Sequence, residues 1–288
     1  MPVTQLFVEG EFDSNLISAV LQEADLEITV TPKGPKYGLQ SKVLEERGRL
    51  GGTIFYLRDR DFDFGLTEIG DAPELLEANL DGVVTHLGWR WSRHEIENYV
   101  AEPAVLSEVA SLVARRTISV EEVTNKLTES AQTLRFYQAA RWTIGTAKKV
   151  LPPYNKEINS RPMKKEWRLP PAEALTAESN VQWVLDMTNP FLNQVQSVLN
   201  EQQIRADFEK YVELFSEANC NNIQWVLHMC SGKDLLTGLK DWFIELGFQS
   251  PKDVVSTVIN HVVQHDPQLP LRHIPEFQAF CQLIQAIE

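Results

Sequence analysis

The sequence predicts an α/β fold, in which a parallel sheet flanked by helices is followed by a mostly α-helical C-terminal part. From Gln5 to about Val100, short runs rich in β-branched and aromatic residues alternate with helical stretches, which is typical of a parallel α/β layer. From Pro103 onward the strand signal nearly disappears and amphipathic helical patterns replace it. No Gly/Ser-rich linker separates the two parts, so we expect an α/β core over 1–102 joined directly to a helical region over 103–288.

Strands are expected at four places in the first part: Gln5 to Glu9, Glu27 to Thr31, Thr53 to Leu57 and Val83 to Leu87. A helix is expected over Ser14 to Ala24, because its apolar residues recur on one stripe and Asp13 or Ser14 can cap it. A second helix is expected over Leu39 to Leu50. A third, short helix should begin near Asp71 and Pro73, since Asp favours the cap and Pro the first turn.

In the second part, helices are expected at about 103–115, 120–150, 178–218, 233–247, 252–264 and 275–287. The longest of these patterns carries five apolar residues for which core positions are predicted, although a homodimer seam stays open: Trp183, Leu185, Phe191, Val195 and Leu199.

Bulk composition indicates a soluble, folded protein of the cytoplasm. Hydrophobic residues make up 43% and charged residues 23% of the 288 positions, a globular balance. Acids stand at the N-terminus where a secretory signal would carry bases, and no apolar run is long enough to span a membrane, so no membrane partner is expected. The three cysteines are widely spaced, which excludes a CxxC zinc or redox motif and favours reduced thiols.

Acidic residues follow successive strand-like runs. Glu9 ends the first run and Asp13 begins the next helix, while Asp59 and Asp61 follow the third run at a spacing of two, which in an extended chain places both side chains on one side. Glu95 and Glu97 repeat that spacing after the fourth run. Ligands of open α/β sheets bind where the strands end, so these carboxylates should share one crevice.

Crowded carboxylates repel one another unless a divalent cation lies between them, which implies Mg²⁺ or Mn²⁺. Two such ions about 4 Å apart would stabilise the attacking and leaving oxygens of phosphodiester cleavage, which is endonuclease chemistry. Two alternatives stay open: a small-molecule phosphohydrolase that uses Asp59, and a non-catalytic interaction module that keeps the acids for folding or metal binding.

A net charge of −13 would repel nucleic acid at long range, so a nucleic-acid substrate needs a local basic patch. The segment from Lys148 to Arg168 holds seven bases against two acids, with Tyr154 and Trp167 interleaved, which suits a phosphate backbone with stacked bases as well as a solvated loop. Its bases are Lys148, Lys149, Lys156, Arg161, Lys164, Lys165 and Arg168.

The motifs LFVEGEFD, FYLRDRDFD, SRHEIENYV and SGKDLL together resemble the Toprim domain of overcoming-lysogenization-defect (OLD) nucleases, in the stand-alone form found beside ABC-type ATPases. The resemblance extends to the Toprim effector subunits of PARIS anti-phage defence systems. It covers roughly the first hundred residues and the region of Gly232 and Lys233, and only the acidic motifs are specific.

The resemblance implies a metal-dependent endonuclease that cleaves RNA, such as transfer RNA, or DNA. It assigns Glu9, Asp13, Asp59, Asp61 and Glu97 as metal ligands, with Glu9 also in proton transfer and Lys233 stabilising charge on the phosphate. No ATPase motif stands in this chain, so the implied ABC-type ATPase partner would be a separate protein that keeps a toxic effector in check.

Overall fold

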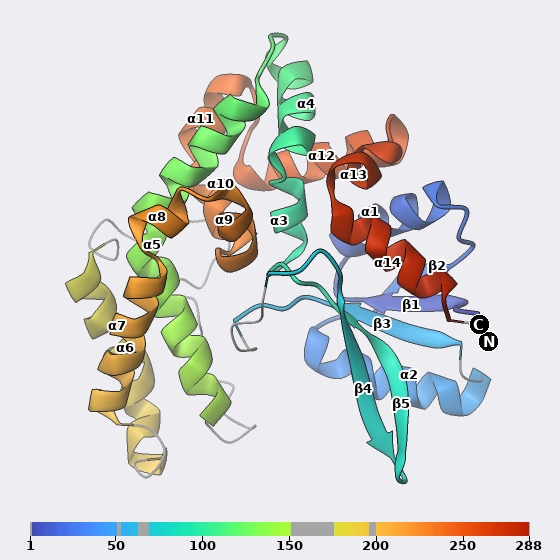
Figure 1. Cartoon of the computed structure of the whole chain (residues 1–288), viewed down its shortest axis with the longest axis horizontal. Coiled ribbons are helices and arrows are strands. Elements are labelled where there is room, and N and C mark those ends of the chain that lie inside the picture. Colours follow the sequence, from blue (N-terminus) through green and yellow to red (C-terminus); the bar gives the residue numbers. More distant parts are fainter. Residues whose placement is uncertain (1, 51–52, 63–68, 151–175, 196–199, 288) are drawn as a thin grey trace.

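The computed structural model describes residues 2–50, 53–62, 69–150, 176–195 and 200–287. Over these residues it is an α/β structure with a large helical part, as expected, and its sheet has five strands, one more than predicted (Figure 1). The basic residues Lys156, Arg161, Lys164, Lys165 and Arg168 lie outside the described residues.

The sheet has the strand order β2-β1-β3-β5-β4 and is mostly parallel. The four predicted strands are confirmed within a few residues: β1 (Gln5–Val8), β2 (Thr29–Pro32), β3 (Ile54–Arg58) and β5 (Val83–Arg90). Parallel pairing aligns β1 with both β2 and β3, and β3 with β5. The carboxyl ends of β1 and β3 therefore meet at the same edge.

The helix predicted near Asp71 and Pro73 is wrong. The chain there forms β4 (Glu74–Leu80), which pairs antiparallel with β5 in a hairpin. Asp81 and Gly82 both have positive φ, 51° and 87°, as a two-residue hairpin turn requires. This turn preference outweighs the weak capping pattern at Asp71 and Pro73.

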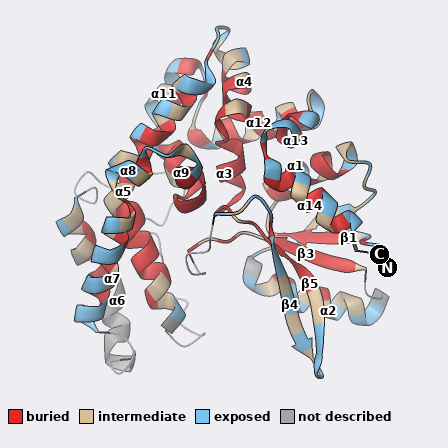
Figure 2. Cartoon of the chain, in the orientation of Figure 1, coloured by how far each residue is buried: buried red, intermediate tan, exposed pale blue. Residues whose placement is uncertain are grey.

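Helices cover both faces of the sheet. Side chains alternate along β1, so Leu6 and Val8 pack with α1 (Glu11–Glu23), while Phe7 packs on the opposite face with α2 (Lys36–Leu50). The alternation of side chains along the strands thus separates two buried clusters. Strands β1 and β3 are buried between the helices, whereas β4 is largely exposed (Figure 2).

The helical part begins with α3 (Ile96–Val100) and α4 (Pro103–Ala114), followed by the 31-residue α5 (Val120–Val150). Around α5 pack α6 (Ala177–Val195), α7 (Glu201–Leu214), α8 (Glu217–Cys220) and α9 (Ile223–Met229). The core prediction is confirmed for Leu185, which is buried, while Trp183 is half-buried and packs against the core with its ring on Tyr137 at 5.5 Å between centroids. The side chains of Phe191 and Val195 and all of Leu199 lie outside the described part of the chain.

Two of the long predicted helices are divided. The Asn200 side chain caps a new helix by accepting from the Gln203 N–H at 2.9 Å, so the expected helix over 178–218 does not continue through residue 200. The pattern over 233–247 is split at Leu239 into α10 (Gly232–Gly238) and α11 (Lys240–Leu246).

The last three helices return to the sheet: α12 (Pro251–Gln264), α13 (Gln268–His273) and α14 (Pro275–Gln285). Both α12 and α13 contact α1, and the α14 residue Phe280 packs edge-on against Trp89 of β5, at 5.4 Å between centroids. One hydrophobic core therefore runs through both predicted parts. Among the described helices, none combines the length and apolar character needed to cross a bilayer.

Candidate active site

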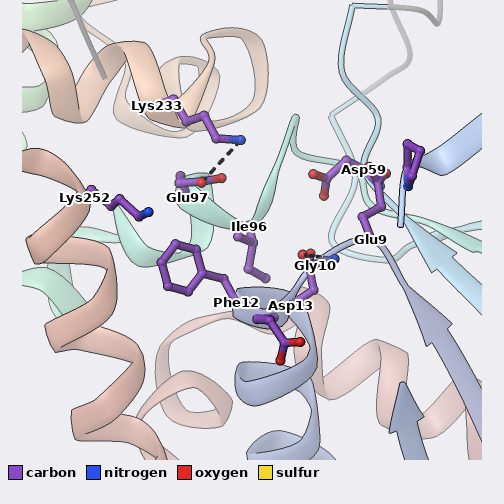
Figure 3. A pocket seen from close by; sticks show the side chains of 11 residues that line it. Glu9, Gly10, Phe12, Asp13, Asp59, Ile96, Glu97, Lys233 and Lys252 are labelled. Atoms are coloured by element: carbon purple, nitrogen blue, oxygen red, sulfur yellow. Dashed lines mark hydrogen bonds and ion pairs between the residues drawn. The ribbon is translucent and has the colours of Figure 1, made fainter. Parts of the chain in front are cut away.

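A pocket of about 520 Å³ opens where β1 and β3 end, between α1, α3, α10 and α12. Acidic side chains from three segments far apart in the sequence line it, together with two lysines (Figure 3). Its charged lining residues are Glu9, Glu11, Asp13, Asp59, Glu97, Lys233 and Lys252.

Glu9 and Asp59 are brought together by the pairing of β1 with β3. Each follows its strand directly, and the Asp59 backbone N–H donates to Glu9 Oε1 at 3.1 Å. The hydrogen bond ties the two strand ends together, so both side chains face the pocket.

Asp13 reaches the same pocket from the first turn of α1. The helix begins at Glu11, with Gly10 in the extended conformation before it, so Asp13 is inside the helix rather than at its cap. Its Oδ2 accepts from the Gly10 N–H at 3.2 Å, which leaves the other carboxylate oxygen for a ligand. The side chain is buried.

Glu95 and Glu97 both pair with Lys233, across the junction of α3 and α10. Lys233 Nζ lies 2.8 Å from Glu95 Oε2 and 3.3 Å from Glu97 Oε1. Glu95 Oε1 also accepts from the Ser231 hydroxyl at 2.6 Å and from the Lys233 backbone N–H at 2.9 Å. Glu95 does not line the pocket; its contacts orient the lysine that does.

Asn98 and Gly232 explain why the SGKD segment docks at this point. Asn98 Oδ1 accepts from the backbone N–H groups of Gly232 and Glu95 at 3.1 and 3.2 Å, and its amide donates to the carbonyls of Leu227 and Cys230, each at 2.9 Å. A Cβ at Gly232 would lie 2.4 Å from the Asn98 nitrogen, a contact that only glycine avoids. The segment is therefore held tightly against the start of α3.

Asp61 is placed differently from the expected extended geometry. The chain turns at Asp61, where φ is 48°, and its N–H donates to the His94 carbonyl at 3.0 Å. Asp61 stays close enough to affect Asp59 electrostatically but is not among the residues that line the pocket. Between the two acids, the buried Arg60 side chain donates to the His228 carbonyl and holds this loop against the helical part.

Burial and like charge raise the pKa values of the pocket acids. Burial raises the pKa of Asp13 to about 6 and that of Glu97 to about 7, with Lys233 lowering both in part. Burial also raises the pKa of Asp59 well above its usual range, and the neighbouring Asp13, Glu9 and Asp61 raise it further. Positive charge in the pocket would relieve this repulsion.

The donor chemistry of the pocket fits a hard divalent cation. Asp59 Oδ1 and Glu97 Oε2 are buried without a hydrogen-bond partner among the described residues, and carboxylate oxygens are the ligands that Mg²⁺ prefers. The described side chains do not, however, converge into a group of three or more His, Cys, Asp or Glu that could hold a metal as they stand. Glu9, Asp13, Asp59 and Glu97 supply suitable oxygens, and binding would have to draw them closer.

Two features of the pocket were not foreseen. The orienting role of Glu95 was not assigned, although its spacing of two from Glu97 was visible in the sequence. Lys252, at the second position of α12, belongs to no motif, and we find no sequence signal that would have marked it. Of the predicted basic patch, Lys148 and Lys149 lie at the end of α5 and do not line the pocket.

No family model matches the chain, and no curated protein matches it either. The resemblance to Toprim nucleases therefore stays a prediction based on the acidic motifs.

Proposed function

We propose that the protein is a metal-dependent endonuclease of the Toprim type, cleaving RNA or DNA. The observation that carries the proposal is that Glu9, Asp13, Asp59 and Glu97 line one pocket that Lys233 also enters. Buried carboxylates with raised pKa values beside a cation are typical of a catalytic site, because packing alone does not favour this arrangement.

Each side chain has a role in this proposal. Glu9, Asp13, Asp59 and Glu97 would hold Mg²⁺ or Mn²⁺, and Asp61, outside the pocket lining, would add negative charge near Asp59. Two bound ions would supply positive charge beside the attacking and leaving oxygens of the phosphodiester. Glu9, at the end of β1, would also accept a proton. Lys233, oriented by Glu95, would donate to a non-bridging phosphate oxygen as negative charge develops there.

The test is cleavage of total transfer RNA and of plasmid DNA by the purified protein in Mg²⁺ or Mn²⁺, with and without EDTA. The Glu9→Gln variant keeps the shape of the side chain and removes its charge. Glu45→Gln, at an exposed position of α2, is the matched control. Metal-dependent cutting that Glu9→Gln loses and Glu45→Gln keeps supports the proposal. Intact RNA and DNA in Mn²⁺ would count against a nuclease that acts alone.

We further propose that the nuclease is the toxic effector of an anti-phage system, kept in check by a separate ABC-type ATPase. This rests on the resemblance of the acidic motifs to stand-alone Toprim effectors. Induced expression of the wild type should arrest bacterial growth, whereas Glu9→Gln should not. Equal growth with both proteins would contradict autonomous toxicity and shift the search to the triggering partner.

A further inference from the structure

Lys252 lines the wall of the pocket that faces the acids. It lies at the second position of α12, and its side chain reaches toward the pocket rather than back along the helix (Figure 3). Phe12 and Ile96 lie between Lys252 and the side of the pocket formed by Glu9 and Asp59. An apolar strip thus separates this lysine from the carboxylates at the strand ends.

The two lysines of the pocket differ in how their charge is balanced. Lys233 is mostly buried and paired with two carboxylates, Glu95 and Glu97, so the protein itself offsets its charge. Lys252 is exposed, and no carboxylate of the described residues lies within ion-pair distance of its Nζ. Of the two, Lys252 is the cation whose charge is available to a ligand.

We propose that Lys252 binds a phosphate group of the substrate next to the phosphate that is cleaved. The inference rests on the proposed nuclease function and adds to it a preference for a polynucleotide over a single phosphate ester. A chain of net charge −13 with an acidic pocket repels a polyanion, so an unbalanced lysine at the pocket wall favours binding there. The apolar strip of Phe12 and Ile96 separates its phosphate from the reacting one.

The experiment compares Lys252→Gln with wild type on two substrates, an oligonucleotide of about twenty nucleotides and bis(p-nitrophenyl) phosphate, which has no neighbouring phosphate. On the oligonucleotide we expect KM to rise roughly tenfold with kcat little changed. The slope of log KM against log salt should fall by about 0.7 to 0.9, the loss of one phosphate contact. Hydrolysis of the small ester should stay unchanged. Lys252→Arg should restore oligonucleotide binding, and Lys240→Gln, at an exposed site of α11 outside the pocket, is the matched control.

Equal oligonucleotide kinetics for Lys252→Gln and wild type would overturn the inference while leaving the nuclease intact. A matching loss on the small ester would also overturn it, because the lysine would then act on the reacting phosphate. If the wild type cuts neither substrate, the proposed function fails. The role of Lys252 is then tested separately, by measuring binding of the labelled oligonucleotide in Ca²⁺ by fluorescence anisotropy. Weaker binding and a smaller salt slope for Lys252→Gln than for Lys240→Gln would support the contact; equal binding, or no binding by the wild type, would overturn it.

Discussion

Replacing Glu97 by Gln should make the free energy of unfolding less dependent on pH. Burial raises the pKa of Glu97 from 4.5 to about 7. A carboxyl whose pKa is higher in the folded state contributes stability that is fully present below its unfolded pKa and is lost as pH rises through the folded value. At about 1.4 kcal/mol per pH unit, the wild type should lose roughly 3 kcal/mol through this group between about pH 5 and pH 8.

The glutamine keeps the volume of Glu97 and removes its titration, while Lys233 retains its ion pair with Glu95. The two proteins should therefore be similar near pH 5, and the variant should be more stable by up to about 3 kcal/mol near pH 8. Urea unfolding in EDTA, followed by circular dichroism at several pH values, measures the difference between the two curves. Asp13, whose pKa is raised to about 6, contributes the same pH dependence of the free energy of unfolding to the wild type and to the variant.

Glu245→Gln, at an exposed position of α11, is the control and should follow the wild-type pH profile. Parallel curves for Glu97→Gln and wild type would refute the reasoning, because they would mean that the carboxyl at residue 97 titrates alike in the folded and unfolded chain.

Three more predictions follow from the same contacts. Gly232→Ala should lower the free energy of unfolding in urea by about 2 kcal/mol or more, because the new Cβ would lie 2.4 Å from the Asn98 backbone nitrogen. Gly48→Ala, in open space on α2, is the control and should be neutral or stabilising. Equal effects of the two substitutions would contradict the close packing at Gly232. Glu95→Gln should cost about 2 kcal/mol and lower kcat, because it weakens the charge-assisted hydrogen bonds of a buried carboxylate that orients Lys233, although Lys233 keeps Glu97. Unchanged stability and activity would exclude an orienting role. Mg²⁺ should raise the midpoint of thermal unfolding, and EDTA should reverse the change. At a Mg²⁺ concentration 100-fold above Kd, the free energy of unfolding should increase by about 2.7 kcal/mol. A shift no larger than that caused by KCl at equal ionic strength would argue against a metal site.

The parallel sheet was predictable because strand periodicity is a local property. Leu6, Phe7 and Val8 are apolar without interruption, as a strand buried on both faces requires, and the structure buries all three. The hairpin at Asp81 and Gly82 was missed for a local reason of another kind. Asp-Gly before an apolar run is a hairpin signal, whereas the helix was expected from Asp71 and Pro73 upstream, which favour helix starts.

The acids at the strand ends could be anticipated because parallel strands place their carboxyl ends together, which brings Glu9 beside Asp59. The path of the chain after β3 could not be anticipated from the sequence. Asp61 leaves the pocket lining because Arg60 is bound by the His228 carbonyl and the chain turns at positive φ. These constraints come from the helical part, far along the sequence.

The basic side of the pocket depends still more on distant contacts. Lys233 reaches the acids because Asn98 binds the backbone around Gly232 and because Glu95 accepts from the first turn of α10. Lys252 reaches the pocket because α12 packs against α1, the helix that carries Asp13. A periodic pattern reports which face of a helix is buried but not which helix it meets, so the acids of this site can be inferred from the sequence and its cations require the fold.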